Sequence, residues 1–184
     1  MSWLNRDAWT GGLDLTHRWG DSGYEIDVSV MGSHLRGSTD AILDAQTSSA
    51  RYFQRPDASH VDVDSSLTHM EGYAAKIWGG RFSQGRFRFG LGYIARSPGF
   101  ECNDLGYMQR ADRNMGVYWM QWRGWEPGRF VKKYSTNINL WRSWNFDGEM
   151  YDLGGNVNGS CMFVNEWEIY GLSLIHISEP TRPY

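Results

Sequence analysis

The sequence predicts an all-β fold in which about seven long antiparallel strands follow one another as an up-and-down meander. Three observations predict it. Apolar and polar residues alternate with a period of two over long runs, which is typical of strands with two unlike faces. Tight-turn motifs separate the runs at hairpin spacing, and several runs are longer than the strands of most soluble sandwiches.

The expected strands lie near residues 8–18, 23–35, 67–79, 84–96, 114–125, 130–144 and 148–170. The turns between them are Gly20-Asp21-Ser22-Gly23, Gly79-Gly80, Glu126-Pro127-Gly128 and Asn145-Phe146-Asp147-Gly148. The alternation is clearest between Tyr24 and Val30, where no position breaks it. Phe87, Phe89, Leu91 and Tyr93 likewise share one face of the fourth strand.

Two connections are longer than a hairpin turn. Residues 36–66 are expected to hold one short helix, Ala41 to Phe53, with Thr39 or Ser38 as its N-cap and acidic residues in its first turn. Residues 97–113 show no periodicity and predict an ordered loop. Short turns that alternate with long loops are typical of outer-membrane barrels.

Strand length separates the two candidate architectures. A membrane-spanning strand needs about 9–11 residues, whereas a sandwich strand usually has about 5–6. The long strands therefore favour an outer-membrane-type β-barrel. We expect the barrel to be partial and unclosed, because bacterial single-chain barrels have an even number of strands, from about eight upward, and about seven are found here. A soluble carbohydrate-binding β-sandwich that uses exposed tryptophans is the alternative. An interfacial aromatic girdle is expected at the strand ends from Trp119, Trp122, Trp125, Trp141, Trp144 and Trp167.

The composition excludes several classes. Aromatic residues make up 15% of the 184 residues, too many for a disordered chain, and two cysteines exclude a disulfide-rich mini-protein. A net charge of -3 argues against a nucleic-acid partner. Cys102 and Cys161 could form a disulfide in an oxidising compartment or remain free thiols.

The two ends are expected to be incomplete. The first residues contain no secretory signal. Leu172 to Arg182 resemble the translation of a transposase adapter used in DNA sequencing libraries. We therefore expect residues 1–171 to form a partial barrel domain and residues 172–184 to be a non-native tail.

Several segments resemble one bacterial family: Gly32–Ser38, Ser48–Asp64, Ala95–Phe100 with Asn103–Tyr107, and Trp141–Phe146. In that uncharacterised family a barrel domain of unknown function follows a carbohydrate-binding family-nine-like domain. The resemblance implies a signal peptide, such an upstream domain and an outer-membrane location with lipid around the barrel. It implies no activity and no catalytic residue.

The polar parity of the strands is expected to line a wet lumen that binds or passes a polar solute, for which the resemblance suggests a saccharide. The lumen candidates are Arg86, Arg88, Asn137, Asn139, Asn156, Asn158, Glu166 and Glu168. Arginines on this parity could select polar solutes or simply pair with acids. Glu166 and Glu168 could also be a glycosidase pair, but two carboxylates on one strand in water favour a polar lining.

Two loops hold further candidates. Asp57, Asp62 and Asp64, near His60, have the spacing of weak calcium ligands, and local turns are the favoured alternative. Glu101, Asn103 and Asp104 are expected to hold their loop together or to contact a ligand as a plug in the lumen. No nucleophile, phosphate-loop or metalloprotease motif occurs, so we expect no cofactor and no enzyme activity, a secreted hydrolase being least favoured.

Overall fold

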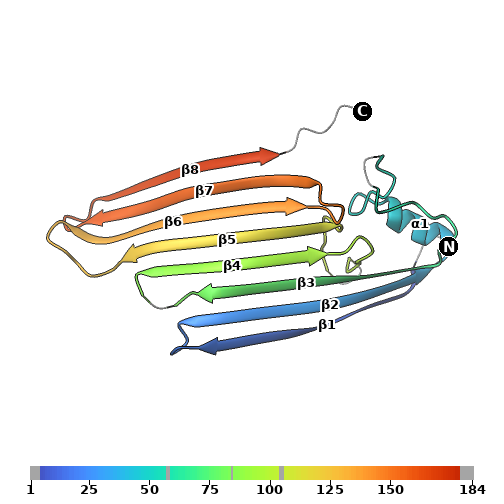
Figure 1. Cartoon of the computed structure of the whole chain (residues 1–184), viewed down its shortest axis with the longest axis horizontal. Helices are drawn as coiled ribbons and strands as arrows, with labels where there is room; N and C mark the ends of the chain where they lie inside the picture. The colour runs from blue at the N-terminus through green and yellow to red at the C-terminus, as the bar shows by residue number, and fades with distance from the viewer. Residues whose placement is uncertain (1–4, 57–58, 84, 104–105, 179–184) are drawn as a thin grey trace.

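A computed structural model describes residues 5–56, 59–83, 85–103 and 106–178. Its strands form one antiparallel sheet in the order β1 to β8, each hydrogen-bonded to the next along the chain (Figure 1). The elements are β1 (Asn5–Trp19), β2 (Tyr24–Gly37), α1 (Thr39–Thr47), β3 (His69–Arg81), β4 (Phe87–Arg96), β5 (Arg113–Gly124), β6 (Val131–Trp144), β7 (Met150–Phe163) and β8 (Glu168–Ser178). The all-β meander is confirmed.

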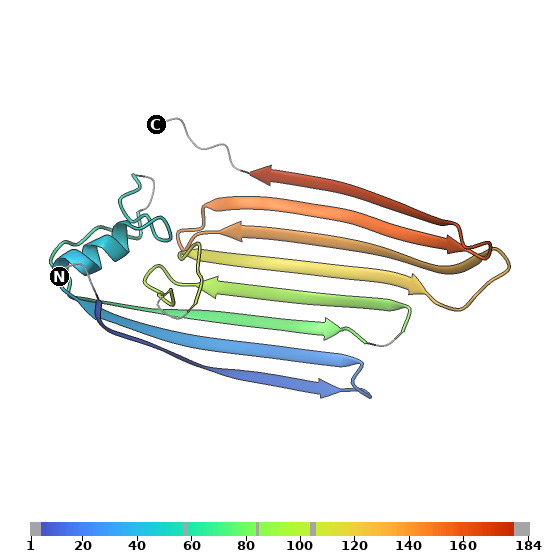
Figure 2. The ribbon, with the colours of Figure 1, turned by 180° about the vertical axis from the view of Figure 1, so that it is seen from behind.

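The sheet is unclosed, as expected. Strands β1 and β8 form its opposite edges in both views and do not pair with each other (Figures 1 and 2). Short turns join the strands at one end of the sheet, which we call the turn end. The helix and the long connections gather at the other, the loop end (Figure 2).

The structure has eight strands where the sequence predicted about seven, because the run at 148–170 divides between β7 and β8. The chain reverses after Phe163, whose N–H donates to the carbonyl of Trp167 over 2.8 Å. Glu166 adopts a left-handed φ of 68° in this turn. An asparagine, Asn165, precedes it, and Asn favours such turns. Glu166 therefore does not share a strand face with Glu168.

The helix is shorter than expected. Ser38 is its N-cap, and its hydroxyl accepts the N–H of Ala41 over 3.2 Å. The helix ends at Thr47, because Ser48 returns to an extended backbone. Tyr52 then takes a left-handed φ of 52°. The interval to Phe53 is consequently a turn rather than a further helical segment.

The register places apolar side chains on one face of the sheet. Directly paired residues share a face, and cross-strand partners such as Leu15 and Val28, Ile77 and Tyr93, and Ile138 and Val157 follow one another across it. No second layer of described residues covers this apolar face: Leu13 is 82% exposed, Leu91 58% and Val157 47%. The opposite, polar face carries the alternate residues.

The buried core is small and lies at the loop end. One cluster joins Ile42 of α1 to Leu35 and Met70, and a second contains Phe100, Met108 and Ala111. Leu35 and Met70 belong to the polar parity, so α1 packs on that side of the sheet. Within the described ranges, no helix has the length and apolar character needed to cross a bilayer.

The C-terminal half of β8 departs from the pattern of one apolar and one polar face. Leu172 to Ser178 pair with β7. Leu172 and Leu174 nevertheless lie on the polar parity, opposite Asn158 and Asn156, and are 73% and 63% exposed. The expectation that residues 172–184 form a non-native tail remains a prediction.

Candidate functional site

A chain of side-chain amides crosses the polar face from β4 to β7. The guanidinium of Arg88 donates to Oε1 of Gln121, whose Nε2 donates to Oδ1 of Asn137 over 2.7 Å. Asn137 then donates to Asn158 over 2.8 Å, and Asn158 donates to Asn156 over 2.9 Å. Every bond runs in the same direction, so the chain starts at a cation and ends at an amide.

The chain ends in one donor and one acceptor. Oδ1 of Asn156 accepts from both Asn158 and Asn139, the latter over 2.8 Å. Among the described residues, no side chain and no loop backbone group forms a hydrogen bond with Nδ2 of Asn156 or with Oδ1 of Asn139. An amide can donate two bonds and accept two. A polar solute would therefore find both kinds of group on this pair of asparagines.

Three tryptophans lie on the same face beside the amides. Trp78 and Phe82 are stacked with ring centroids 6.0 Å apart, and Phe82 is stacked on Trp119 at 6.1 Å. The guanidinium of Arg88 lies 5.2 Å from the centre of the Trp119 ring. Trp141 lies over Gly154, where a Cβ would come 2.8 Å from its Nε1. Glycine is needed here because the indole occupies the space of a side chain.

Several charged side chains of the polar face form ion pairs. Arg18 contacts Glu25 over 2.5 Å and Lys76 contacts Asp27 over 2.5 Å, both between adjacent strands. Arg113 contacts Asp152 over 3.3 Å at the opposite side of the sheet. The tryptophans and amides lie between these pairs, and the guanidinium of Arg88 lies beside them.

The loop after β4 folds onto the polar face. The N–H of Glu101 donates to the hydroxyl of Ser33 on β2 over 2.9 Å. The side chain of Arg51, 1% exposed, meets the Glu101 carboxylate over 2.5 Å and donates to the Phe100 carbonyl over 2.6 Å. Asn103 fixes the next turn, because its Oδ1 accepts the N–H of Met108 over 2.6 Å. Both long connections therefore cover one end of the polar face.

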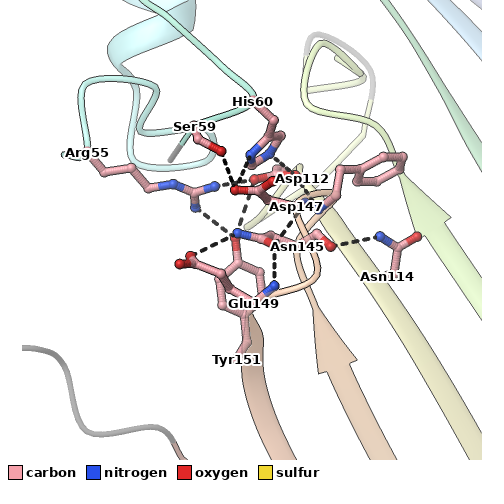
Figure 3. Close-up of polar contacts among 10 residues, drawn as sticks. Arg55, Ser59, His60, Asp112, Asn114, Asn145, Asp147, Glu149 and Tyr151 are labelled. Carbon is pink, nitrogen blue, oxygen red and sulfur yellow. Dashed lines mark hydrogen bonds and ion pairs between the residues drawn. The ribbon is translucent and has the colours of Figure 1, made fainter. Parts of the chain in front are cut away.

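A second network ties three connections together at the loop end (Figure 3). Its centre is Asp112, which has a left-handed φ of 48° and is 1% exposed. Its carboxylate accepts from Arg55, from Nε2 of His60 over 2.9 Å and from the N–H of Phe146 over 3.0 Å. Arg55 also donates to the Tyr151 hydroxyl over 2.7 Å.

The connection between β6 and β7 is built around Asn145. Its Oδ1 accepts the N–H groups of Asp147 and Glu149 over 3.0 and 2.8 Å. Its carbonyl accepts from Asn114 on β5 over 3.3 Å (Figure 3). Asp147 in turn accepts the Ser59 hydroxyl over 2.5 Å. These contacts link the three loop-end connections to one another and hold the loops in place.

The structure brings some of the expected lumen residues together and separates others. Arg88 and the four asparagines 137, 139, 156 and 158 belong to the amide chain. Arg86 instead pairs with Glu126 over 2.5 Å at the turn end, where both are exposed. Glu166 lies in the β7–β8 turn and meets Lys132 over 2.6 Å, so it is not a strand-face residue. Glu168 pairs with Met162 at the start of β8.

Sequence reasoning missed part of this site. It assigned Trp119 and Trp141 to an interfacial girdle, but both lie within strands on the polar face, opposite Asn139 and Gly154. The strand parity could have shown this for Trp119, since its neighbours Tyr118 and Met120 belong to the apolar set. Gln121 and Asp112 were not singled out either.

The loop candidates that the structure describes form no metal cluster. Asp64 accepts both the N–H and the hydroxyl of Ser66, which hold the pKa of its carboxyl below the ordinary value. Asp62 is exposed, and Asp57 and Asp104 lie outside the described residues. Over the described ranges, no three His, Cys, Asp or Glu side chains are placed to hold a metal ion.

Cys102 and Cys161 are free thiols. Cys102 lies in the loop-end connection after β4, whereas Cys161 lies near the turn end of β7 opposite Tyr134. The two cysteines therefore lie about one strand length apart. This distance far exceeds the roughly 7 Å between Cα atoms that a disulfide can span. The alternative of a disulfide is therefore wrong.

The protein-family comparison matches the domain of unknown function DUF5916 over residues 31–179. The chain belongs to this family. Comparison with curated proteins gave no significant match, and neither did comparison with solved structures. The DUF5916 match runs from the second half of β2 to the end of β8, and thus covers both the amide chain and the Asp112 network.

Proposed function

We propose that this DUF5916 chain forms part of the wall of an outer-membrane β-barrel whose polar face lines a lumen that binds or passes a polar solute. The observation that carries the proposal is the exposed apolar face, which runs across all eight strands. Soluble proteins rarely expose a contiguous apolar patch larger than a few hundred Å². Acyl chains of a bilayer would cover it.

Strand length supports the same proposal. The strands contain between 10 and 15 residues, and a tilted strand needs about 9–11 to cross the hydrocarbon layer. Exposed aromatic side chains occupy both ends of the apolar face. Trp9 and Tyr73 lie near the loop end, and Trp19 and Trp122 near the turn end. Membrane barrels carry aromatic side chains in two such belts, one at each membrane interface.

The two edges of the sheet define what the proposal requires. Open strand edges are not tolerated in hydrocarbon, because no water satisfies their backbone groups. Closure of the wall therefore requires further strands beside β1 and β8, from a longer chain or from a second copy. The family resemblance adds an upstream carbohydrate-binding family-nine-like domain and an export signal to the full-length protein, and a saccharide as the solute.

A soluble sandwich is less well supported. It requires a second sheet about 10 Å away, filling the interface with apolar side chains. The described residues form one sheet, and Leu91 and Val157 do not meet another layer.

Vesicle flotation tests the proposal. The whole chain is diluted from urea into phosphatidylcholine vesicles, floated on a density gradient and washed with carbonate. We expect the chain to float with the vesicles after the wash and to show β-sheet circular dichroism. Folded chain that stays at the bottom of the gradient, monomeric and free of lipid, would contradict a membrane wall.

A further inference from the structure

We propose that Trp78, Trp119 and Trp141, together with Asn139 and Asn156, form a site for a neutral oligosaccharide chain that lies across the strands of the polar face. The inference rests on the proposed function in one respect, namely that this face meets water. It goes further by naming the ligand class, the residues that hold it and the direction in which it lies.

Glycines let the two outer tryptophans lie close to the sheet. A Cβ on Gly90 would come 3.0 Å from Cζ2 of Trp78, and a Cβ on Gly92 would collide with the same ring. Trp141 takes the equivalent place over Gly154 on β7. In each pair the indole belongs to one strand and the glycine to the next strand in chain order. Both rings are only partly buried, which leaves surface for a ligand.

The spacing of these rings indicates an extended ligand. Trp78 is opposite Gly92, Gly92 opposite Val117, and Val117 opposite Trp141, so the two indoles share one row across the sheet. Three strand spacings separate their backbones, about 14 Å. One monosaccharide does not reach across this distance. Trp119 belongs to the next row and lies between them.

The asparagines supply the hydrogen bonds. Asn139 is directly opposite Trp119 and Asn156 is opposite Asn139, so the unpaired acceptor and donor lie in the row beside the tryptophans. The C–H face of a pyranose ring packs on an aromatic ring, and its hydroxyls both donate and accept at the ring's edge. This matches a flat indole with an amide pair next to it.

Charge argues for a neutral sugar. On this face Lys76 forms an ion pair with Asp27, and Arg113 forms one with Asp152. The guanidinium of Arg88 is held by Gln121 and the Phe82 carbonyl. The free donor and acceptor of the site belong to the neutral amides of Asn156 and Asn139, which a neutral chain can use as they stand.

Calorimetry of the whole chain in detergent micelles tests this site. The probes are malto-, cello-, xylo- and mannotetraose, with glucose as the monomer. We expect at least one tetrasaccharide to bind and glucose to bind far more weakly. Trp141→Ala and the double variant Asn139→Ala/Asn156→Ala should each weaken tetrasaccharide binding about tenfold or more, equivalent to roughly 1.4 kcal/mol. Trp122→Ala is the matched control, since this 52% exposed indole lies on the apolar face.

The outcomes separate the two proposals. If the chain floats with vesicles but no tetrasaccharide binds, or if Trp141→Ala and Trp122→Ala bind alike, the oligosaccharide site is wrong and the membrane wall stands. If a tetrasaccharide binds in the expected variant order but the chain fails to float, the site stands and the membrane wall is wrong. Equal binding of glucose and tetrasaccharides would overturn the extended ligand.

Discussion

The indole of Trp141 on β6 lies against the backbone of Gly154 on β7, and a methyl group on that glycine would come 2.8 Å from Nε1. The two residues are also direct partners in the β6–β7 ladder. The glycine therefore helps to form the aromatic surface, because its lack of a side chain lets the indole lie against the sheet. This relationship can be tested without altering the tryptophan itself.

Gly154→Ala should displace the Trp141 ring and weaken binding of the responsive tetrasaccharide about tenfold, roughly 1.4 kcal/mol. The reason is steric, because the new Cβ and the indole cannot both keep their places. The affinity is measured by calorimetry and the ring environment by near-ultraviolet circular dichroism. Gly32→Ala is the control, since nothing lies within 4 Å of a Cβ there. If both variants behave alike, the packing of Trp141 on Gly154 has no role in binding.

Asp112→Ala should loosen the loop end while leaving the sheet intact. Removing one partner of a buried ion pair costs roughly 3–5 kcal/mol, and here Arg55 and His60 both lose their acceptor. Hydrogen exchange should rise in residues 51–56 and 145–149 and stay constant in β5 and β6. Asp112→Asn keeps the preference for a left-handed φ, so its hydrogen-exchange rates should lie between those of the parent chain and those of Asp112→Ala. Faster exchange spread evenly over the strands would show that the network stabilises the sheet instead.

Cys102 should react slowly with iodoacetamide near neutral pH. Burial and the nearby Glu101 carboxylate raise the pKa of its thiol above the ordinary value, so less of it is thiolate at any given pH. In a Cys161→Ser variant the alkylation rate should therefore start to rise at a higher pH than that of a cysteine in a short peptide. Glu101→Gln should shift the pH profile downward by removing the neighbouring charge. A profile that matches the peptide's would mean that Cys102 is open to solvent.

Arg51→Ala should release the loop after β4 from the polar face. Its guanidinium is buried and joins the Glu101 carboxylate to the Phe100 carbonyl, so truncation leaves both oxygens without this donor. Limited proteolysis should cut within residues 97–103 at least several-fold faster than in the parent chain. Arg86→Ala is the control, because its ion pair with Glu126 is exposed at the turn end and such pairs contribute about 0–1 kcal/mol. Equal cleavage of the two variants would deny Arg51 this role.

The two faces of the sheet could be predicted because alternation is a local signal. Tyr24 to Val30 shows it without interruption, and the structure keeps that parity across neighbouring strands. The division of the last run could not be predicted from periodicity, since parity continues through the turn at Glu166. Only Asn165 marked that position.

The site was harder to predict than the fold. The four asparagines were visible as a polar parity, but Gln121 joins them only because β4, β5 and β6 take one particular register. Asp112 comes from a segment without periodicity, and its partners Arg55 and His60 are more than fifty positions away in the chain. The sequence predicts a strand end for Trp141, because it does not show which glycine lies beneath the ring.

The most direct measurement compares an arginine placed on each face. Leu91 is on the apolar face and 58% exposed, and Met31 is an apolar residue on the polar parity with 39% exposure. In phosphatidylcholine vesicles, Leu91→Arg should lower the free energy of unfolding by about 2–4 kcal/mol, the cost of a lipid-facing arginine near the bilayer centre. Met31→Arg should change it by no more than about 0.5 kcal/mol, as for a residue in water. If Leu91→Arg leaves the free energy of unfolding unchanged, or if Met31→Arg lowers it more than Leu91→Arg does, the apolar face of the sheet does not meet lipid.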